Sequence, residues 1–500
     1  MSDGTLLEAL AGGPAEAPAL WTPEDGAALT YGGLAAVVAE LAGRLRSFGV
    51  ERGERVAFAL PPGPELVELL LAVSSLGAAA APLNPAYSEP EYAFYLEDLA
   101  PRVLLLPAGE LAAARAAASA GTTVVDVTQN PGGAPRLELD GRELADAGGG
   151  PAASPDDVAL LLHTSGTTSR PKQVPLRHRN LVASARSIRR HYALGPEDVS
   201  YCAMPLFHVH GLVASTLAQL FAGGTVVVPR RVAPGRFWRQ LVDHGVSWYS
   251  ASPTFHTMLL ERAPEELPAE TRLRFVRSCS SALSPEFQAR MESYLGVPVL
   301  QAYGMTEASH EMASNPLPPA RRVPGSVGLG TGSEVAVVAP GGEPLPEGTQ
   351  GEVVVRGPSV MSGYLANDKA NAEAFYGEWF RTGDLGTLDG GYLHLVGRIK
   401  EIIDRGGEKV SPMEVEEALL RHPDVAEAVV YGIPDAKYGQ VVGSAVVLRG
   451  GTGVDALAAH CREQVAAFKV PTVFHVVETI PKTPTGKVQR PRMAAHFGED

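Results

Sequence analysis

Short apolar runs alternate with longer amphipathic segments through most of the chain. The run at residues 55–60 predicts a strand, residues 64–76 predict a helix, and 103–106 predict a second strand. The same alternation recurs over 213–228 and over 248–276. Strands that alternate with helices are typical of layered α/β folds with parallel sheets. The sequence therefore predicts a large layered N-terminal domain.

The hydrophobic pattern changes in the C-terminal third. Residues 351–356 alternate as short strands do and have Gly and Pro turns nearby, which predicts a β subdomain. Beyond Gly397, residues 411–420 read as a capped helix, 425–448 contain two strand candidates, and 455–468 predict another helix. This order predicts a small α+β domain at the C-terminal end.

Composition limits the classes of protein that fit. A length of 500 residues exceeds what one hydrophobic core organises, so we expect two or more domains. The net charge of -14 argues against a nucleic-acid-binding face. Three scattered cysteines and the absence of a signal-peptide pattern favour a reducing compartment, and we expect the cytoplasm. The apolar run at 69–81 is too short to cross a bilayer, and the Ala- and Gly-rich segment 108–155 predicts surface excursions.

The first group of candidate functional residues lies in a loop that follows the apolar run 158–162. Small hydroxyl residues, a glycine and a lysine offer many hydrogen-bond donors and little bulk, as a triphosphate requires. A cluster of Ser, Thr and Gly is also typical of an ordinary surface turn. The candidate phosphate-binding residues are Thr164, Ser165, Gly166, Thr167, Thr168 and Lys172.

Four further motifs follow this loop in the sequence. They lie at residues 303–307 (YGMTE), 382–384 (TGD), 397–401 (GRIKE) and 481–487 (PKTPTGK). In this order and at these separations, the five motifs resemble those of the adenylate-forming superfamily, which includes acyl-CoA synthetases. The resemblance covers residues 31–497. It implies an N-terminal adenylation domain over 1–396, a hinge at 397–401 and a mobile C-terminal lid domain over 402–500.

The resemblance also implies roles around ATP, Mg²⁺ and coenzyme A. Thr306 would contact the α-phosphate and Glu307 would bind Mg²⁺, since a hard cation prefers carboxylate oxygen; the alternative for this pair is an ordinary helix start. Asp384 would accept hydrogen bonds from the ribose hydroxyls, although an Asp in a Gly-Asp turn is common. Adenine and ribose contacts would come from Ser280, Ser281, Ala282, Tyr303 and Arg398.

The C-terminal domain supplies the remaining implied roles. Lys487 would enter the site during adenylation and bridge the carboxylate and the α-phosphate, which suits an ammonium on a flexible stem. Lys400 would be the hinge residue around which this domain rotates. Gly406 and Gly407 resemble the loop that lines the tunnel for the coenzyme A thiol. One site would thus form an acyl adenylate and then a thioester.

The identity of the acid is predicted from the detailed sequence of several segments. Segments at 163–172, 206–211, 277–283, 306–310, 314–318 and 393–397 resemble the oxalyl-CoA synthetase subgroup. Oxalate is two carboxylates with no tail, so its pocket should be short and lined with donors. The candidate donors are His208, Ser281 and His310, with Arg277 less favoured and Gln301 limiting the pocket's length. His208 is also a candidate catalytic residue as the gate beside the carboxylate, and a helix-face histidine is the alternative for His310.

One position departs from the subgroup, and several functions stay open. Gln173 follows the loop lysine where the subgroup usually has glycine. The first hypothesis is a CoA ligase for oxalate or another small acid, acting on small molecules as a monomer or homodimer. The second is a ligase for a medium-chain, aromatic or biosynthetic acid. The third is a nucleotide-binding homologue without catalysis, against which the intact motifs argue.

Overall fold

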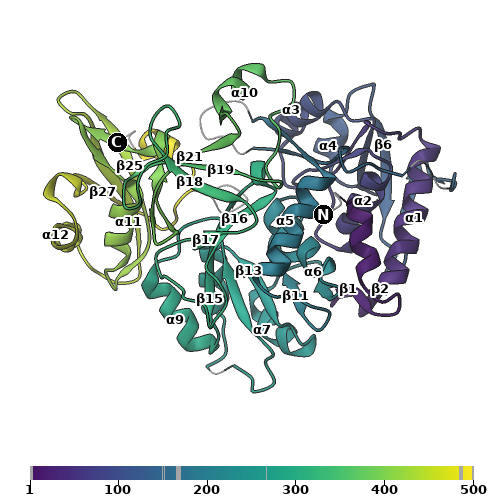
Figure 1. Ribbon diagram of the computed structural model, residues 1–500, viewed down its shortest axis with the longest axis horizontal. Helices are drawn as coiled ribbons and strands as arrows, with labels where there is room; N and C mark the ends of the chain where they lie inside the picture. The colour runs from purple at the N-terminus through teal and green to yellow at the C-terminus, as the bar shows by residue number, and fades with distance from the viewer. Residues whose placement is uncertain are drawn as a thin grey trace.

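The computed structural model describes residues 4–148, 150, 152–164, 171–265, 267–482 and 488–497. Two large sheets form the N-terminal part of the molecule (Figure 1). The first has eight strands in the order β10-β9-β4-β3-β5-β6-β7-β8, and its neighbouring strands β4, β3, β5 and β6 run parallel. Its strands are β3 (Arg55–Phe58), β4 (Ala79–Pro82), β5 (Val103–Pro107), β6 (Thr123–Thr128), β7 (Arg136–Leu139), β8 (Arg142–Glu143), β9 (Val158–His163) and β10 (Gln173–Arg177).

The second sheet has nine strands in the order β17-β16-β15-β14-β13-β11-β12-β1-β2. Its centre is parallel from β15 through β14, β13, β11 and β12 to β1. Its strands are β1 (Pro18–Thr22), β2 (Ala27–Thr30), β11 (Val199–Cys202), β12 (Thr225–Val227), β13 (Trp248–Ala251), β14 (Phe275–Ser278), β15 (Val299–Met305), β16 (His310–Ser314) and β17 (Leu329–Gly330). Parallel strands of this kind are buried on both faces, which explains their continuous apolar sequences.

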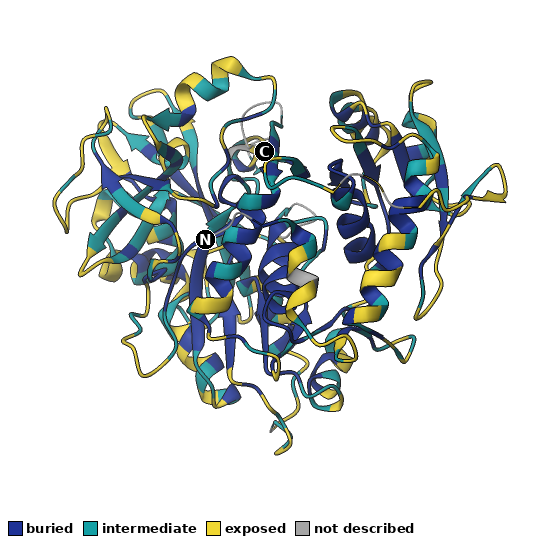
Figure 2. Cartoon of the chain, turned by 45° about the vertical axis from the view of Figure 1, so that its right-hand side comes forward, coloured by how far each residue is buried: buried dark blue, intermediate teal, exposed yellow. Residues whose placement is uncertain are grey.

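Helices cover both sheets and also fill the space between them. The inner layer is made of α2 (Pro64–Ser75), α5 (His178–His191), the π-helical segment η2 (His210–Leu217) and α6 (Ala218–Leu220), which share one hydrophobic core with both sheets. Their buried surfaces appear dark blue in Figure 2, whereas outer helices turn exposed residues to solvent. The other helices of this part are α1 (Tyr31–Ser47), α3 (Glu89–Leu99), α4 (Ala112–Ala117), α7 (Pro234–Asp243), α8 (Pro253–Leu260) and α9 (Pro285–Leu295), besides the short η1 (Leu6–Gly12) and η3 (Thr306–Ala308).

A smaller antiparallel sheet follows, in agreement with the predicted β subdomain. Strands β18, β19, β21 and β20 are neighbours in that order, and β22 pairs with β21. They are β18 (Glu334–Val338), β19 (Gly351–Arg356), β20 (Phe375–Tyr376), β21 (Trp379–Asp389) and β22 (Tyr392–Arg398), and α10 (Asp368–Ala374) precedes β20. The alternation of buried and partly buried residues along β21 shows that one face of this sheet packs on the core.

The C-terminal part is a separate α+β unit with its own core. Its sheet has the order β24-β23-β26-β25, with β27 on β26 (Figure 1). The elements are η4 (Ile399–Glu401), β23 (Ile403–Arg405), β24 (Glu408–Val410), α11 (Pro412–Leu420), β25 (Val425–Asp435), β26 (Gly439–Leu448), α12 (Val454–Gln464), η5 (Ala467–Lys469), β27 (Val473–Val476), η6 (Arg490–Arg492) and α13 (Met493–Phe497). Ser411 caps α11 by accepting a hydrogen bond from the Glu414 N–H. The predicted fold class, a large layered α/β domain and a small α+β domain, is confirmed.

One prediction about the fold is wrong. The composition of segment 108–155 predicts surface excursions, but the segment contributes α4 and strands β6, β7 and β8 to the eight-stranded sheet. Its Ala and Gly content masks the β-branched run at 123–128, which pairs in parallel with β5. Among the described residues, no helix combines the length and the apolar character that crossing a bilayer requires.

Candidate active site

The candidate site lies at one edge of the nine-stranded sheet. Because β11, β14 and β15 are parallel, the loops that leave their carboxyl ends meet at the same edge. Open α/β sheets bind ligands at this edge. His208 follows β11, Ser280, Ser281 and Ala282 follow β14, and Thr306 and Glu307 follow β15.

The base of the predicted phosphate loop is closed by two hydrogen bonds between Thr164 and Lys172. The Thr164 N–H donates to the Lys172 carbonyl at 2.9 Å, and the Lys172 N–H donates to the Thr164 hydroxyl oxygen at 3.2 Å. These contacts continue the antiparallel pairing of β9 with β10. The predictions at Ser165, Gly166, Thr167 and Thr168 lie outside the described residues.

Gln173 is tied to the end of α3 just beyond this loop. Its Nε2 donates to the Asp98 carbonyl at 2.6 Å and to the Asp98 Oδ2 at 2.7 Å. The same Oδ2 lies 2.9 Å from Nε2 of His163, which is the register partner of Gln173 across β9 and β10. We call Asp98, His163 and Gln173 the Asp98 clamp. It holds both strands of the loop base on one carboxylate.

Burial favours the neutral form of the imidazole within the clamp. Burial lowers the pKa of His163, against the opposing effect of Asp98. A neutral ring can donate from Nε2 to the Asp98 carboxylate, so both contacts to this carboxylate are donations from uncharged groups. Tyr95 adds a ring contact to His163 with centroids 4.8 Å apart. Sequence reasoning identified Gln173 as unusual but did not find its partner Asp98.

A tyrosine joins the loop lysine to the predicted metal ligand. The Nζ of Lys172 lies 4.4 Å from the ring centre of Tyr364, a cation–π contact. The Tyr364 hydroxyl donates to Oε1 of Glu307 at 3.0 Å, and Glu307 is only 7% exposed. Burial and the neighbouring Glu307 raise the pKa of Tyr364, so it remains a donor. The sequence offered no signal for Tyr364.

Glu307 also fits the chemistry of a magnesium ligand. It is a buried carboxylate beside the hydroxyl of Thr306, at the carboxyl end of β15. Hard oxygen groups of this kind suit Mg²⁺, which is usually held by one or two carboxylates together with phosphate oxygens. Within the described part of the chain, no cluster of three His, Cys, Asp or Glu forms a protein-only metal cage.

The predicted ribose residues converge between β15 and the β21–β22 hairpin. Arg398 is the register partner of Asp384, and its Nε lies 3.0 Å from the Asp384 Oδ1. The Tyr303 hydroxyl donates to the other carboxylate oxygen of Asp384. Burial, followed by the charge of Asp384, raises the pKa of Tyr303 well above its ordinary value, which keeps its hydroxyl protonated. Two predicted nucleotide contacts, Tyr303 and Arg398, therefore share the carboxylate of a third, Asp384.

The predicted acid-pocket residues differ in their surroundings. His310 opens strand β16 with a φ of 106° and is 3% exposed, so it does not lie on a helix face. Gly304 is required beside it, because a Cβ there would lie 1.9 Å from the His310 carbonyl oxygen. His208 is half-buried, with its ring 4.8 Å from that of Phe207, whereas Ser281 is exposed. Gln301 is buried on β15.

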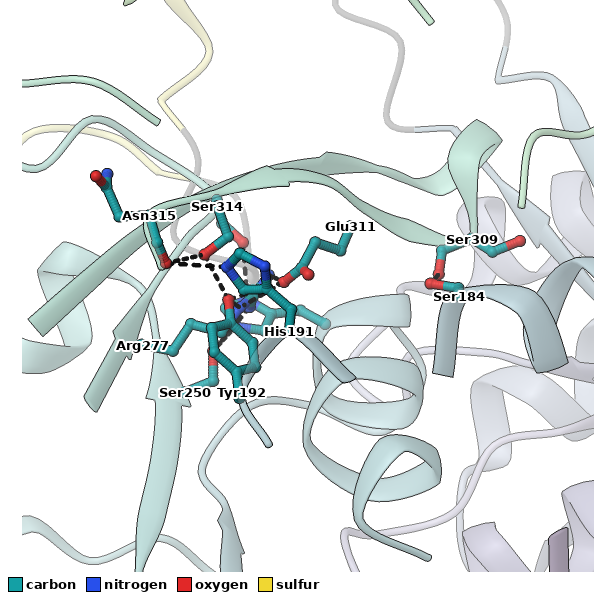
Figure 3. A network of polar contacts seen from close by, with 11 residues as sticks. Ser184, His191, Tyr192, Ser250, Arg277, Ser309, Glu311, Ser314 and Asn315 are labelled. Carbon is teal, nitrogen blue, oxygen red and sulfur yellow. Dashed lines mark hydrogen bonds and ion pairs between the residues drawn. The ribbon is translucent and has the colours of Figure 1, made fainter. Parts of the chain in front are cut away.

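Arg277, the less favoured acid ligand, is fully buried in the core. Its Nη2 lies 2.9 Å from Oε2 of Glu311, and its Nε donates to the Tyr192 hydroxyl at 2.9 Å. The Tyr192 hydroxyl in turn donates to Glu311 at 2.9 Å. Figure 3 shows these side chains converging from β14, β16 and the residue that follows α5. Arg277 is therefore committed to internal partners.

Lys400, the predicted hinge residue, lies between two ion pairs. Arg398 is bound to Asp384 of the N-terminal part, while Glu401 forms an ion pair with Arg490 of the C-terminal part at 3.0 Å. Lys400 itself is exposed between them. Gly406 and Gly407, with φ values of 65° and 94°, form the exposed turn between β23 and β24. Lys487 lies outside the described residues.

This fold and this set of strand-end residues define the class of adenylate-forming enzymes. The AMP-binding enzyme family matches residues 7–365, and the AMP-binding enzyme C-terminal domain matches residues 414–487. The chain belongs to the AMP-binding enzyme family.

Individual relatives resemble the chain along almost its whole length. A probable CoA ligase, CCL9, of Humulus lupulus is 45% identical over 94% of this chain and 91% of its own. An oxalate–CoA ligase of Arabidopsis thaliana is 44% identical and covers 94% of both chains. Among solved structures, ATP-bound MatB from Rhodopseudomonas palustris has a TM-score of 0.90, with 30% identity over 100% of this chain and 99% of its own. The recognition drawn from the five motifs is confirmed.

Proposed function

We propose that this protein is an ATP-dependent acid–CoA ligase that first forms an acyl adenylate and then an acyl-CoA thioester, with oxalate as the acid. The observation that carries the proposal is that three predicted segments meet at the carboxyl end of β15. Tyr364 joins Lys172 of the loop base to Glu307, and Tyr303 joins the same strand to Asp384 and its partner Arg398. The relatives named as CoA ligases and oxalate–CoA ligase support the reaction class and the acid.

ATP binding is assigned to the residues around Asp384 and the loop base. Asp384 offers its carboxylate to the ribose hydroxyls and is held by Tyr303 and Arg398. The loop at 164–172 contacts the β- and γ-phosphates, and Thr306 contacts the α-phosphate. Mg²⁺ would be held by Glu307 and would neutralise charge on the phosphates. The chain's own contribution to adenylation is positioning and charge stabilisation.

The acid end of the site is assigned to His208, Ser281 and His310. A dianion with no tail needs donors at both carboxylates, and these side chains offer imidazole and hydroxyl donors. Gln301 on β15 closes the space that a longer acid would need. His208 beside Phe207 would gate the approach of the carboxylate.

The second half-reaction is assigned to rotation of residues 402–500 about Lys400, with 1–396 as the fixed domain. The fixed contacts of Arg398 and Glu401 confine the change of backbone to the residues between them. Rotation would withdraw Lys487 and bring Gly406 and Gly407 to the tunnel for coenzyme A. The thiol then attacks the mixed anhydride and releases AMP.

A pyrophosphate-release assay with a panel of acids, with and without coenzyme A, tests the assignment. We expect turnover with oxalate and consumption of coenzyme A. Turnover of a longer or aromatic acid but not of oxalate would show that the small-acid assignment is wrong, and no pyrophosphate with any acid would refute the ligase activity.

A lysine substitution tests the two half-reactions separately. Lys487→Ala should abolish adenylation and spare thioester formation from supplied acyl adenylate. Lys482→Ala is the matched control, because Lys482 in the same segment pairs with Glu427 at 2.7 Å. Equal loss of both half-reactions in the Lys487 variant would contradict domain rotation.

A further inference from the structure

A chain of hydrogen bonds leads from the buried ion pair to the edge of the candidate site. Arg277 Nη1 donates to the Ser250 hydroxyl oxygen at 3.0 Å. That oxygen lies 2.7 Å from Nε2 of His210, and Nδ1 of His210 lies 2.9 Å from the Ser280 hydroxyl oxygen. We call Arg277, Ser250, His210 and Ser280 the His210 relay. The proposed chemistry uses none of the three inner residues.

The direction of each hydrogen in the relay follows from the donors available. A guanidinium can only donate, so Ser250 accepts from Arg277. Ser250 is fully buried, and Arg277 and His210 are the partners of its hydroxyl in the described part of the chain, so its single hydrogen points to His210, the one of the two that can accept. Nε2 of His210 is therefore an acceptor without a hydrogen. In a neutral imidazole the hydrogen then lies on Nδ1, where it is donated to Ser280. This assignment rests on the partners of the two nitrogens.

The charge of the ion pair favours the same state of His210. Arg277 has no exposed surface, and Glu311, its counter-ion, is 1% exposed. The guanidinium and His210 contact the same Ser250 oxygen, so an imidazolium at His210 would lie one hydroxyl away from a positive charge. Removing either member of a buried ion pair is strongly destabilising, so the pair is a rigid support for the relay.

The outer end of the relay is the Ser280 hydroxyl, whose hydrogen is not used within the relay. Ser280 accepts from His210, so its own hydrogen is directed elsewhere. Ser280 is exposed and has a φ of 79°, at the carboxyl end of β14 among the strand-end loops of the site. His210 also stacks on His310, with ring centres 5.0 Å apart and planes 21° from parallel. The relay thus fixes both the Ser280 hydroxyl and a face of the proposed acid pocket.

We propose that Arg277 and Ser250 are positioning residues that hold His210 with its hydrogen on Nδ1, so that the Ser280 hydroxyl donates to a carboxylate oxygen of the acid. This assignment deepens the proposed function and rests on it. Sequence reasoning placed a donor at Ser281, whereas the relay ends one residue earlier.

The state of His210 is measured first, by ¹⁵N NMR of the histidine-labelled protein at neutral pH. The His210 signals are identified by their loss in His210→Gln. We expect Nε2 to be unprotonated and Nδ1 protonated in the unmodified chain. A hydrogen on Nε2, or a protonated ring, would overturn the relay whether or not the protein has ligase activity.

Kinetics then test the consequence for the acid. Ser250→Ala should raise KM for oxalate about 10-fold, with kcat and KM for ATP within about 3-fold, since one oriented hydrogen bond to a carboxylate contributes about 1.4 kcal/mol. Ser280→Ala should raise KM for oxalate to the same extent, and the double variant should lose no more than either single one. Ser250→Thr keeps the hydroxyl and should restore the KM.

The control removes a buried hydroxyl from η2, the segment that holds His210. Ser215 lies in η2, is fully buried, and its hydroxyl has no hydrogen-bond partner within the described part of the chain. Ser215→Ala should leave KM for oxalate unchanged. An unchanged KM in Ser250→Ala, or additive losses in the double variant, would overturn the relay. If the unmodified chain turns over no acid, the proposed function fails, while the NMR result stands by itself.

Discussion

Replacing Gln173 with Glu tests whether the Asp98 clamp prepares the phosphate loop for ATP. Glu has nearly the same shape as Gln, but it replaces the Nε2 donor with a negatively charged acceptor. Both donations to Asp98, at 2.6 and 2.7 Å, are lost, and two carboxylates then face each other. The change therefore removes the clamp without shortening the side chain.

The expected change in KM for ATP follows from the two hydrogen bonds that Gln173 donates to Asp98. A hydrogen bond to a neutral acceptor contributes about 1 kcal/mol and one to a charged acceptor about 1.5–3 kcal/mol. The Asp98 side chain is 27% exposed, so we take the lower end, about 2.5 kcal/mol in total. If half of this energy holds the loop base in its binding-competent form, KM for ATP rises about 5- to 10-fold. We expect kcat to change less than about 3-fold.

The assay is pyrophosphate release at varied ATP and saturating acid. Gln173→Glu combined with Asp98→Asn should recover part of the loss, because the two carboxylates no longer repel each other, whereas the donation to the Asp98 backbone carbonyl stays lost. Gln464→Glu adds the same charge at an exposed position of α12 and is the control. A normal KM for ATP in Gln173→Glu, or no recovery in the double variant, would refute the clamp.

Three other predictions concern separate parts of the protein. Asp384→Asn should raise KM for ATP about 10-fold or more without changing KM for the acid, because Arg398 and Tyr303 lose their charged acceptor; equal changes in both would contradict the ribose assignment. Glu307→Gln should raise the Mg²⁺ concentration for half-maximal rate about 10-fold in a titration at fixed ATP, and an unchanged requirement would exclude Glu307 as a ligand. Burial, and next the charge of Glu65, raise the pKa of Glu68 from 4.5 to about 8. A raised pKa means that the folded state keeps a proton that the unfolded state releases, so stability falls as pH rises from 4.5 to 8. Glu68→Gln should therefore match the unmodified chain in free energy of unfolding near pH 4 and exceed it by roughly 3–5 kcal/mol near pH 8, measured by urea unfolding; an equal gain at both values would contradict the shift.

The sequence was most informative where a motif is local. The loop base at Thr164 and Lys172 and the Thr306–Glu307 pair each follow an apolar strand, so their positions at strand ends could be predicted from a few residues. The pairing of Asp384 with Arg398 could also be expected, since both belong to motifs that one hairpin brings into register.

The residues that sequence reasoning missed are linked across long separations. Gln173 meets Asp98 75 positions earlier, and Tyr364 meets Glu307 57 positions away. An Asp near the end of a helix or a Tyr before a short helix resembles many structural residues, so no local pattern distinguishes them. Arg277 illustrates the opposite error, because its charge made it a candidate ligand although its partners are internal.

The partners of the site residues also indicate which parts can move during the reaction. The Asp98 clamp and the His210 relay lie wholly within residues 1–396, so the phosphate end and the acid end have supports that domain rotation leaves in place. Arg398 is bound to Asp384 on the N-terminal side, and Glu401 is bound to Arg490 on the C-terminal side. The backbone between these two ion pairs is exposed at residues 399–400. If residues 402–500 rotate as proposed, we therefore expect the change of backbone at residues 399–400, so that the proposed exchange of Lys487 for the thiol leaves the adenylate site in place.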